Sequence, residues 1–155
     1  MSIGKVHQVS VSNGGVPKNA VASAQIHRIG VEGDSQRDTE NHGGPDRAVC
    51  LFSWDLIQRL QDEGHPIEPG WVGENLTVSG IDWDLMAPGR RLRIGDEVEI
   101  ELTSYTNPCS NVAASFINGH FGRIRQGGHP GWSRVYARVL AEGRVAEGDA
   151  VELLD

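Results

Sequence analysis

The sequence has few cysteines and no long apolar run. Only Cys50 and Cys109 are present, and no stretch approaches the roughly 18 apolar residues that a membrane-spanning helix requires. The N-terminus also lacks an apolar run of signal-peptide length. Because proteins that stay inside the cell keep their thiols reduced, we expect a cytoplasmic protein with free cysteines and no membrane partner.

Positive charge is also scarce. The chain carries 14 lysines and arginines against 21 acidic residues, which gives a formal net charge of −7 at pH 7. Such a charge argues against a nucleic-acid partner or an anionic membrane surface, because both would repel the protein. It leaves room for a local basic pocket that binds a small anion.

Several common catalytic and cofactor motifs are missing. The sequence contains no G-x-x-x-x-G-K-[ST] phosphate loop, no G-x-G-x-x-G after a strand, no C-x-x-C, no H-E-x-x-H and no G-x-S-x-G. The six histidines show no metal-ligand spacing. A zinc site or a cysteine–histidine hydrolase built on Cys109 would therefore depend on the fold to bring a histidine to the thiol.

Turn-forming residues are abundant, with 20 glycines and 7 prolines spread along the 155 residues. Residues 98–103 alternate apolar and polar side chains, and residues 48–52 form a continuous apolar run of strand length. With shorter segments of the same kind, these patterns predict about seven strands and two helices. We expect residues 1–155 to form one domain, mainly β, built as a closed or nearly closed β-barrel.

The clearer of the two helices covers residues 54–63. Ser53 can cap its N-terminus and Gly64 can end it. Its apolar residues Leu56, Ile57 and Leu60 share one face. A second pattern is internal: residues 91–99 resemble residues 144–152, each with a Gly-Asp turn that leads into a strand, which predicts two similar hairpins.

A thiol lies at the turn that follows residues 98–103. Asn107 suits the N-cap of a second helix and Pro108 its first position, which places Cys109 about one residue inside that helix. Unpaired N–H groups and the helix dipole would favour a thiolate there, able to act as a nucleophile, a sulfur carrier or a soft metal ligand. The alternative is that Cys109 only fills space. Cys50, inside the apolar run, is interpreted as a packing residue.

Polar glycine turns recur at the ends of the predicted strands. They are Gly33-Asp34, His42-Gly43-Gly44, Gly73-Glu74-Asn75 and Pro108-Cys109. Loops at one rim of a barrel commonly form a binding site, so these turns predict a pocket. The long polar stretch at residues 35–46 agrees with that, because long loops in compact domains are often functional. The alternative is that the glycines only satisfy turn geometry.

The order of the motifs resembles a known family. The motifs are Gly-Val-Glu-Gly-Asp (30–34), His-Gly-Gly-Pro-Asp-Arg-Ala-Val (42–49), Gly-Glu-Asn-Leu (73–76), Arg-Ile-Gly-Asp (93–96), Pro-Cys (108–109), Gly-Trp-Ser-Arg-Val (131–135) and Gly-Asp-Ala-Val (148–151). They resemble the MOSC family, the domain at the C-terminus of molybdenum cofactor sulfurases, from about Gly4 to Leu154. The resemblance implies a barrel similar to the β-barrel domain of pyruvate kinase, and binding of the molybdenum cofactor or a role in sulfur transfer.

The resemblance also implies roles for particular residues. Cys109 matches the family's diagnostic cysteine, which would carry persulfide sulfur or ligate molybdenum, and stand-alone bacterial members are linked to the reduction of N-hydroxylated bases. The implied cofactor-binding residues are Asp34, His42, Gly43, Gly44, Arg47, Glu74 and Asn75. A phosphate on the pterin would pair with an arginine, with Arg47 favoured over Arg91, Arg123, Arg125 and Arg134 because it lies between the His-Gly-Gly turn and a buried strand.

The resemblance further indicates partners. The chain shows neither the pyridoxal-dependent desulfurase domain nor the N-terminal barrel extension of larger family members, so we expect it not to make persulfide from cysteine by itself. A sulfur-donor or electron-donor protein would then be needed beside the pterin cofactor. A different function remains open, namely a small non-catalytic accessory domain that docks on a partner enzyme.

Overall fold

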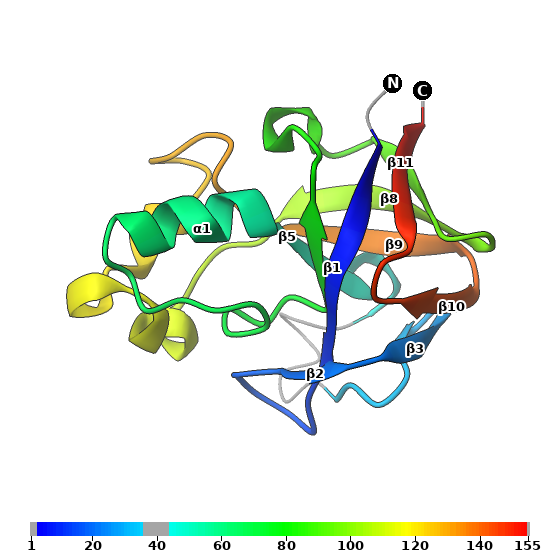
Figure 1. The fold of residues 1–155 in the computed structure, drawn as a ribbon, viewed down its shortest axis with the longest axis horizontal. Coiled ribbons are helices and arrows are strands. Elements are labelled where there is room, and N and C mark those ends of the chain that lie inside the picture. The colour runs from blue at the N-terminus through cyan, green and yellow to red at the C-terminus, as the bar shows by residue number, and fades with distance from the viewer. Residues whose placement is uncertain (1–2, 36–43, 155) are drawn as a thin grey trace.

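Seven strands close into a barrel in the computed structural model, which describes residues 3–35 and 44–154. In order around the ring they are β1 (Ile3–Val11), β11 (Ala150–Leu154), β7 (Arg91–Ile94), β8 (Val98–Tyr105), β9 (Val135–Ala141), β5 (Val49–Ser53) and β6 (Leu76–Ser79). The β1–β11 pairing closes the ring, so the two ends of the chain lie side by side (Figure 1). The prediction of a mainly β, barrel-like fold is confirmed.

Neighbouring strands of the barrel are antiparallel except for β5 and β6, which are parallel. A parallel pair needs a crossover connection, and here the connection contains helix α1 (Trp54–Asp62). A short strand, β2 (Asn19–Val21), extends the sheet beyond β1. A separate three-stranded sheet places β3 (Ser23–His27) between β4 (Gly30–Val31) and β10 (Gly143–Ala146).

The strand patterns follow the burial of each face. On β8, Val98, Ile100 and Leu102 point into the core while the residues between them are partly exposed, which is the predicted alternation. On β5 all five residues are buried, because both faces of this strand are covered. That explains the continuous apolar run of residues 48–52. It also means that the run alone does not show which side chains face the core and which face the cavity.

Helix α1 forms where the sequence predicts it. The Ser53 hydroxyl accepts a hydrogen bond from the Leu56 N–H at 3.1 Å, which satisfies one of the free N–H groups of the first turn. Gly64 follows the helix with a φ of 102°, a conformation that favours glycine. Within the described residues no helix is both long and apolar enough to cross a bilayer.

The segment after Cys109 differs from the predicted helix. It consists of three short 3₁₀ helices, η3 (Ser110–Ser115), η4 (Ile117–Gly119) and η5 (Phe121–Ile124). Asn118, inside η4, has a positive φ of 54°. Ser and Asn side chains at the start compete with regular helix, and Asn118 accepts a conformation that ends it. The segment lies beside α1 on one side of the barrel (Figure 1), where the Ile117 N–H donates to His65 Nδ1 at 3.0 Å. Two further 3₁₀ turns are η1 (Pro45–Arg47) and η2 (Trp83–Leu85).

Only one of the two predicted hairpins is present. β7 and β8 pair across the turn at Gly95, as expected. The second pair is wrong, because β10 pairs with β3 and β11 pairs with β7 and β1. The two turns nevertheless meet, since the Gly95 N–H donates to the Ala150 carbonyl at 2.8 Å.

Candidate functional site

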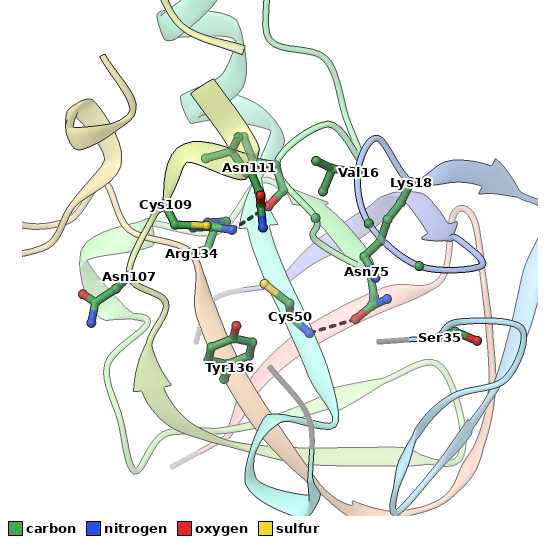
Figure 2. A pocket seen from close by; sticks show the side chains of 15 residues that line it. Val16, Lys18, Ser35, Cys50, Asn75, Asn107, Cys109, Asn111, Arg134 and Tyr136 are labelled. Atoms are coloured by element: carbon green, nitrogen blue, oxygen red, sulfur yellow. Dashed lines mark hydrogen bonds between the residues drawn. The ribbon is translucent and has the colours of Figure 1, made fainter. Parts of the chain in front are cut away.

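A cavity of about 320 Å³ opens where several loops meet the ends of β5 and β9 (Figure 2). Its walls come from the loop between β1 and β2, from residues 72–75 before β6, and from residues 107–112 after β8. The volume falls at the lower end of the range for small-molecule sites. Among the turns predicted to form a pocket, those at Gly73-Asn75 and Cys109 contribute directly to the cavity.

Cys109 lines this cavity and is partly exposed. Its backbone is extended, with φ −138° and ψ 179°, and it is the residue that precedes η3. The expected position one residue inside a helix is therefore wrong, and Asn107 does not cap a helix. A 3₁₀ helix of six residues offers no long macrodipole, so the argument for a thiolate from the helix dipole does not apply here.

A second thiol, Cys50, lines the same cavity, which the sequence did not indicate. Figure 2 shows its sulfur directed from β5 into the space between Asn75 and Tyr136. Burial raises the pKa of the Cys50 thiol, although the nearby positive charge of Arg134 opposes the shift. Cys50 Sγ lies 3.8 Å from Thr106 Oγ1, a buried hydroxyl that does not itself line the cavity.

Arg134 places a buried positive charge beside Cys109 (Figure 2). Only 6% of the residue is exposed. Its Nη1 donates to the Val72 carbonyl, while its Nε is buried and has no hydrogen-bond partner among the described residues. A guanidinium that lines a cavity and keeps one N–H unpaired is suited to donating to an anion.

The other arginines considered as phosphate partners lie elsewhere. The Arg47 guanidinium sits 5.4 Å from the centroid of the Tyr136 ring, and it is this ring, not Arg47, that lines the cavity. Burial raises the pKa of the Tyr136 phenol above its usual range. Arg123 belongs to the lobe beside α1, where it donates to both Glu63 oxygens at 3.0 and 2.7 Å. Arg91 and Arg125 are exposed and do not line the cavity.

Asp34 and Asn75 meet in a buried polar network with Lys18, which the sequence analysis missed. Lys18 Nζ lies 2.7 Å from both Asp34 oxygens, and Asn75 Nδ2 donates to Asp34 Oδ2 at 3.0 Å. Asn75 Oδ1 accepts from the Cys50 N–H at 3.0 Å. The network ties the β1–β2 loop to the wall of the cavity, and Lys18 and Asn75 line that wall.

Glu74 is completely buried beside the cavity wall. Its Oε2 accepts from the Thr77 hydroxyl at 3.0 Å, and its Oε1 has no hydrogen-bond partner among the described residues. Burial raises the pKa of Glu74, and the opposing contributions of the Gly70 and Glu74 N–H groups, of Thr77 and of Arg134 are smaller. Burial therefore favours the neutral acid form of this side chain.

The remaining predicted residues fall at one edge of the described structure. Gly44 has a φ of 91° and precedes η1, and it is exposed rather than part of the cavity lining. His42 and Gly43 lie outside the described residues. No histidine in residues 3–35 or 44–154 lines the cavity with Cys109. In these same ranges no group of three His, Cys, Asp or Glu side chains is arranged to hold a metal ion.

Known proteins share this sequence over most of its length. The chain is 33% identical to the uncharacterized protein YflK of Bacillus subtilis (strain 168) over 146 residues, which is 93% of this chain and 64% of that protein. It is 26% identical to protein YiiM of Escherichia coli (strain K12), covering 88% of this chain and 64% of that protein. The chain thus spans just under two thirds of the length of these relatives.

A fungal relative has a name that describes an activity. The chain is 30% identical over 132 residues to a protein of Gibberella moniliformis (strain M3125 / FGSC 7600) named "Reductase", which covers 81% of this chain but 23% of that longer protein. Among solved structures, YiiM from Geobacillus stearothermophilus superposes with a TM-score of 0.72 at 21% identity, over 98% of this chain and 75% of that one. This likeness supports the fold.

The family model for the MOSC domain matches residues 38–152, which is most of the chain. The match spans β5, the Gly-Glu-Asn turn, Cys109 and Arg134, so the thiol and the buried arginine of the cavity both lie within the matched region. The resemblance seen in the order of the motifs and the barrel seen in the structure agree with this match. The chain belongs to the MOSC domain family.

Proposed function

We propose that this protein binds the molybdenum cofactor in the cavity beside Cys109, and that Cys109 ligates the metal or carries sulfur for it. One observation supports this most strongly: a single cavity brings together an accessible thiol and a buried guanidinium with an unused donor. A thiolate is a soft ligand suited to molybdenum. A guanidinium is suited to a phosphate ester.

The residues of the cavity fit the parts of that cofactor. Arg134 would hold the phosphate through its guanidinium, and Cys109 would face the metal. The Lys18–Asp34–Asn75 network would act indirectly. Its polar groups already form hydrogen bonds within the protein, so its role would be to hold the cavity wall in position. Arg47 would act through the Tyr136 ring, which it covers.

We further propose a reductive activity on N-hydroxylated substrates, a suggestion supported by the name of the fungal relative. When bound, the cofactor would supply the redox centre. Reduction of an N-hydroxylated base breaks the N–O bond, consumes two electrons and two protons, and gives the base and water. The electrons would come from a donor protein, because two free thiols could supply one pair of electrons but would then have to be reduced again for each turnover. The buried side chains of Cys50 and Tyr136, which line the cavity, would keep bulk water from that side of the substrate.

The first test is metal analysis with pterin fluorescence on protein produced in cells that make the cofactor. Wild type is compared with Cys109→Ala and with Ser110→Ala, a matched control at the adjacent exposed residue, whose side chain does not line the cavity. We expect near-stoichiometric molybdenum in wild type and in Ser110→Ala, and loss of the metal in Cys109→Ala. Full loading of a folded Cys109→Ala variant would refute the role of Cys109 as ligand.

A second outcome would separate the two roles of the thiol. If wild type contains pterin but no metal, or neither, a persulfide assay on Cys109 follows. Sulfane sulfur on wild type and none on Cys109→Ala would support sulfur carriage. Absence of metal, pterin and persulfide from wild type would contradict the whole proposal.

A further inference from the structure

Both cysteines of the chain open into one cavity. The 155 residues contain only Cys50 and Cys109, which lie far apart in the sequence, and both line the same space of about 320 Å³. Both are free thiols. Figure 2 shows the two sulfurs directed into this space. The proposed function uses Cys109 alone, so the cavity holds a second sulfur nucleophile to which no role has been assigned.

Cys50 is held in the wall of the cavity by the barrel itself. It pairs with Tyr136 across β5 and β9, and its N–H donates to Asn75 Oδ1 at 3.0 Å. Only 6% of the residue is exposed. A reagent from solvent therefore reaches the Cys50 sulfur through the cavity that it lines.

Cys109 lies close to Cys50 because the chain passes Thr106 just before it. The Thr106 hydroxyl is 3.8 Å from Cys50 Sγ, and Cys109 follows three residues later, a segment that spans at most about 11 Å when fully extended. Cys109 is partly exposed, and its neighbour Ser110 is exposed. Of the two thiols, Cys109 is thus the one that meets a reagent from solvent first.

We propose that Cys50 is the resolving thiol for sulfur carried on Cys109. This inference rests on the sulfur-carrying role proposed above, in which Cys109 holds a persulfide. The Cys50 sulfur attacks the Cys109 sulfur, a disulfide forms between the two cysteines, and the sulfur–sulfur bond of the persulfide breaks. Hydrosulfide leaves into the cavity, and the proton of the Cys50 thiol goes to it or to water.

Atoms and electrons balance in this step. The two cysteine sulfurs give up two electrons, and the sulfane sulfur takes up both as it becomes hydrosulfide. While the disulfide persists, Cys109 can neither carry sulfur nor ligate a metal. An excess of a small thiol reduces the disulfide and restores both thiols, so each cycle of oxidation and reduction releases one sulfide.

The burial of Cys50 favours this order of events. Burial raises the pKa of the Cys50 thiol, which disfavours the reactive thiolate, so a dilute reagent reacts at the accessible Cys109 first. A bond already formed on Cys109 is presented to Cys50 inside the same cavity. The second attack is then intramolecular, and its high effective concentration offsets the low reactivity of the buried thiol.

The thiol pair is tested first with glutathione disulfide, a reagent that does not depend on the proposed function. We expect wild type to lose two hydrogens and to give a peptide in which Cys50 and Cys109 are linked, as seen by mass spectrometry. Ser110→Ala, an exposed neighbour outside the cavity lining, should behave like wild type. Cys50→Ala should stop at a mixed disulfide on Cys109, and Cys109→Ala should stay unmodified. A native wild type that accumulates the mixed disulfide and never links its cysteines would overturn the inference.

The release step is tested with inorganic polysulfide, which delivers sulfane sulfur to Cys109. After the excess reagent is removed, we expect wild type to release about one hydrosulfide per chain as the linked disulfide appears. Cys50→Ala should keep its sulfane sulfur, measured by cyanolysis. Equal release from both proteins would contradict the role of Cys50. Cys50→Ser repeats the comparison if Cys50→Ala does not fold, and the linked peptide of wild type decides the matter if neither variant does.

The two proposals fail in different ways. Protein that links its cysteines with glutathione disulfide, but carries no sulfane sulfur when it is isolated from cells, would count against sulfur carriage and leave the thiol pair intact. Protein that carries sulfane sulfur on Cys109, but never links Cys109 to Cys50, would keep the proposed function and overturn the resolving role of Cys50.

Discussion

The ion pair between Lys18 and Asp34 should be among the most important polar contacts for stability. Both side chains are almost buried, at 9% and 4% exposure, and Lys18 Nζ lies 2.7 Å from each carboxylate oxygen. At that distance the Coulomb attraction is about 6 kcal/mol with an effective dielectric constant of about 20. Much of this is offset by the cost of removing both charges from water, so the attraction is not itself the net stabilisation.

We predict that Lys18→Met destabilises the protein by about 3 kcal/mol. Removing one partner of a buried pair typically costs 3–5 kcal/mol, because the other charge stays buried and uncompensated. Asp34 would keep two donors, the Ser12 N–H at 2.9 Å and Asn75 Nδ2 at 3.0 Å, which places the expected loss at the low end of that range. Methionine retains most of the apolar stem of lysine, so the change reports mainly on charge.

The assay is urea denaturation followed by circular dichroism, with Lys18→Met, Asp34→Asn and the double variant. Since the double variant no longer buries an unpaired charge, it should be less destabilised than the sum of the two single variants. Lys5→Met, at an exposed position on β1, serves as control and should stay within about 0.5 kcal/mol of wild type. A Lys18→Met variant as stable as that control, or strict additivity in the double variant, would refute the reasoning.

Three further predictions follow from single contacts. Ser53→Ala removes the cap that accepts from the Leu56 N–H and should cost about 1 kcal/mol in urea denaturation; a variant as stable as wild type would contradict this. The pKa of Glu74 is raised in the folded state, so Glu74 favours folding only while it is protonated. The stability of wild type relative to Glu74→Gln should therefore decline as pH rises above about 4.3, the pKa in the unfolded chain, and level off above the folded pKa. A difference that does not depend on pH would contradict this. The hydrogen bonds from Arg123 lower the pKa of Glu63, so Arg123→Gln should raise that pKa toward its ordinary value in an NMR titration, and an unchanged titration would show that Arg123 is not the cause.

Local signals in the sequence were sufficient where a structure depends on neighbours along the chain. Helix α1 is one example, because Ser53, the apolar stripe and Gly64 all act within a few residues. Residues 98–103 are another, because alternation follows directly from a sheet with one buried face. The same logic failed after Cys109, where a good cap and a proline precede residues that do not sustain a regular helix.

The residues that the sequence analysis missed depend on contacts between distant segments. Lys18 reaches the cavity from a segment more than a hundred positions from Arg134, and nothing beside Lys18 indicates it. Arg134 was named as one of several candidate phosphate partners, but its neighbours in the sequence gave no reason to prefer it to Arg47. Cys50 was interpreted as a packing residue because a fully buried strand shows the same apolar run whichever way each face points. The family resemblance identified the Asp34 and Glu74–Asn75 turns without showing what their side chains do.

The structure gives the two acidic side chains of those turns opposite electrostatic roles. Asp34 is ionised against Lys18, so this pair adds no net charge to the cavity wall. Burial raises the pKa of Glu74 and of the Cys50 thiol, which favours the neutral form of each. Among the described residues, Arg134 places a buried positive charge at the cavity wall with Cys109, in a protein whose formal net charge is −7. Because buried charges are screened far less than exposed ones, this local charge rather than the acidic surface decides what enters, and an anion is the group that it favours.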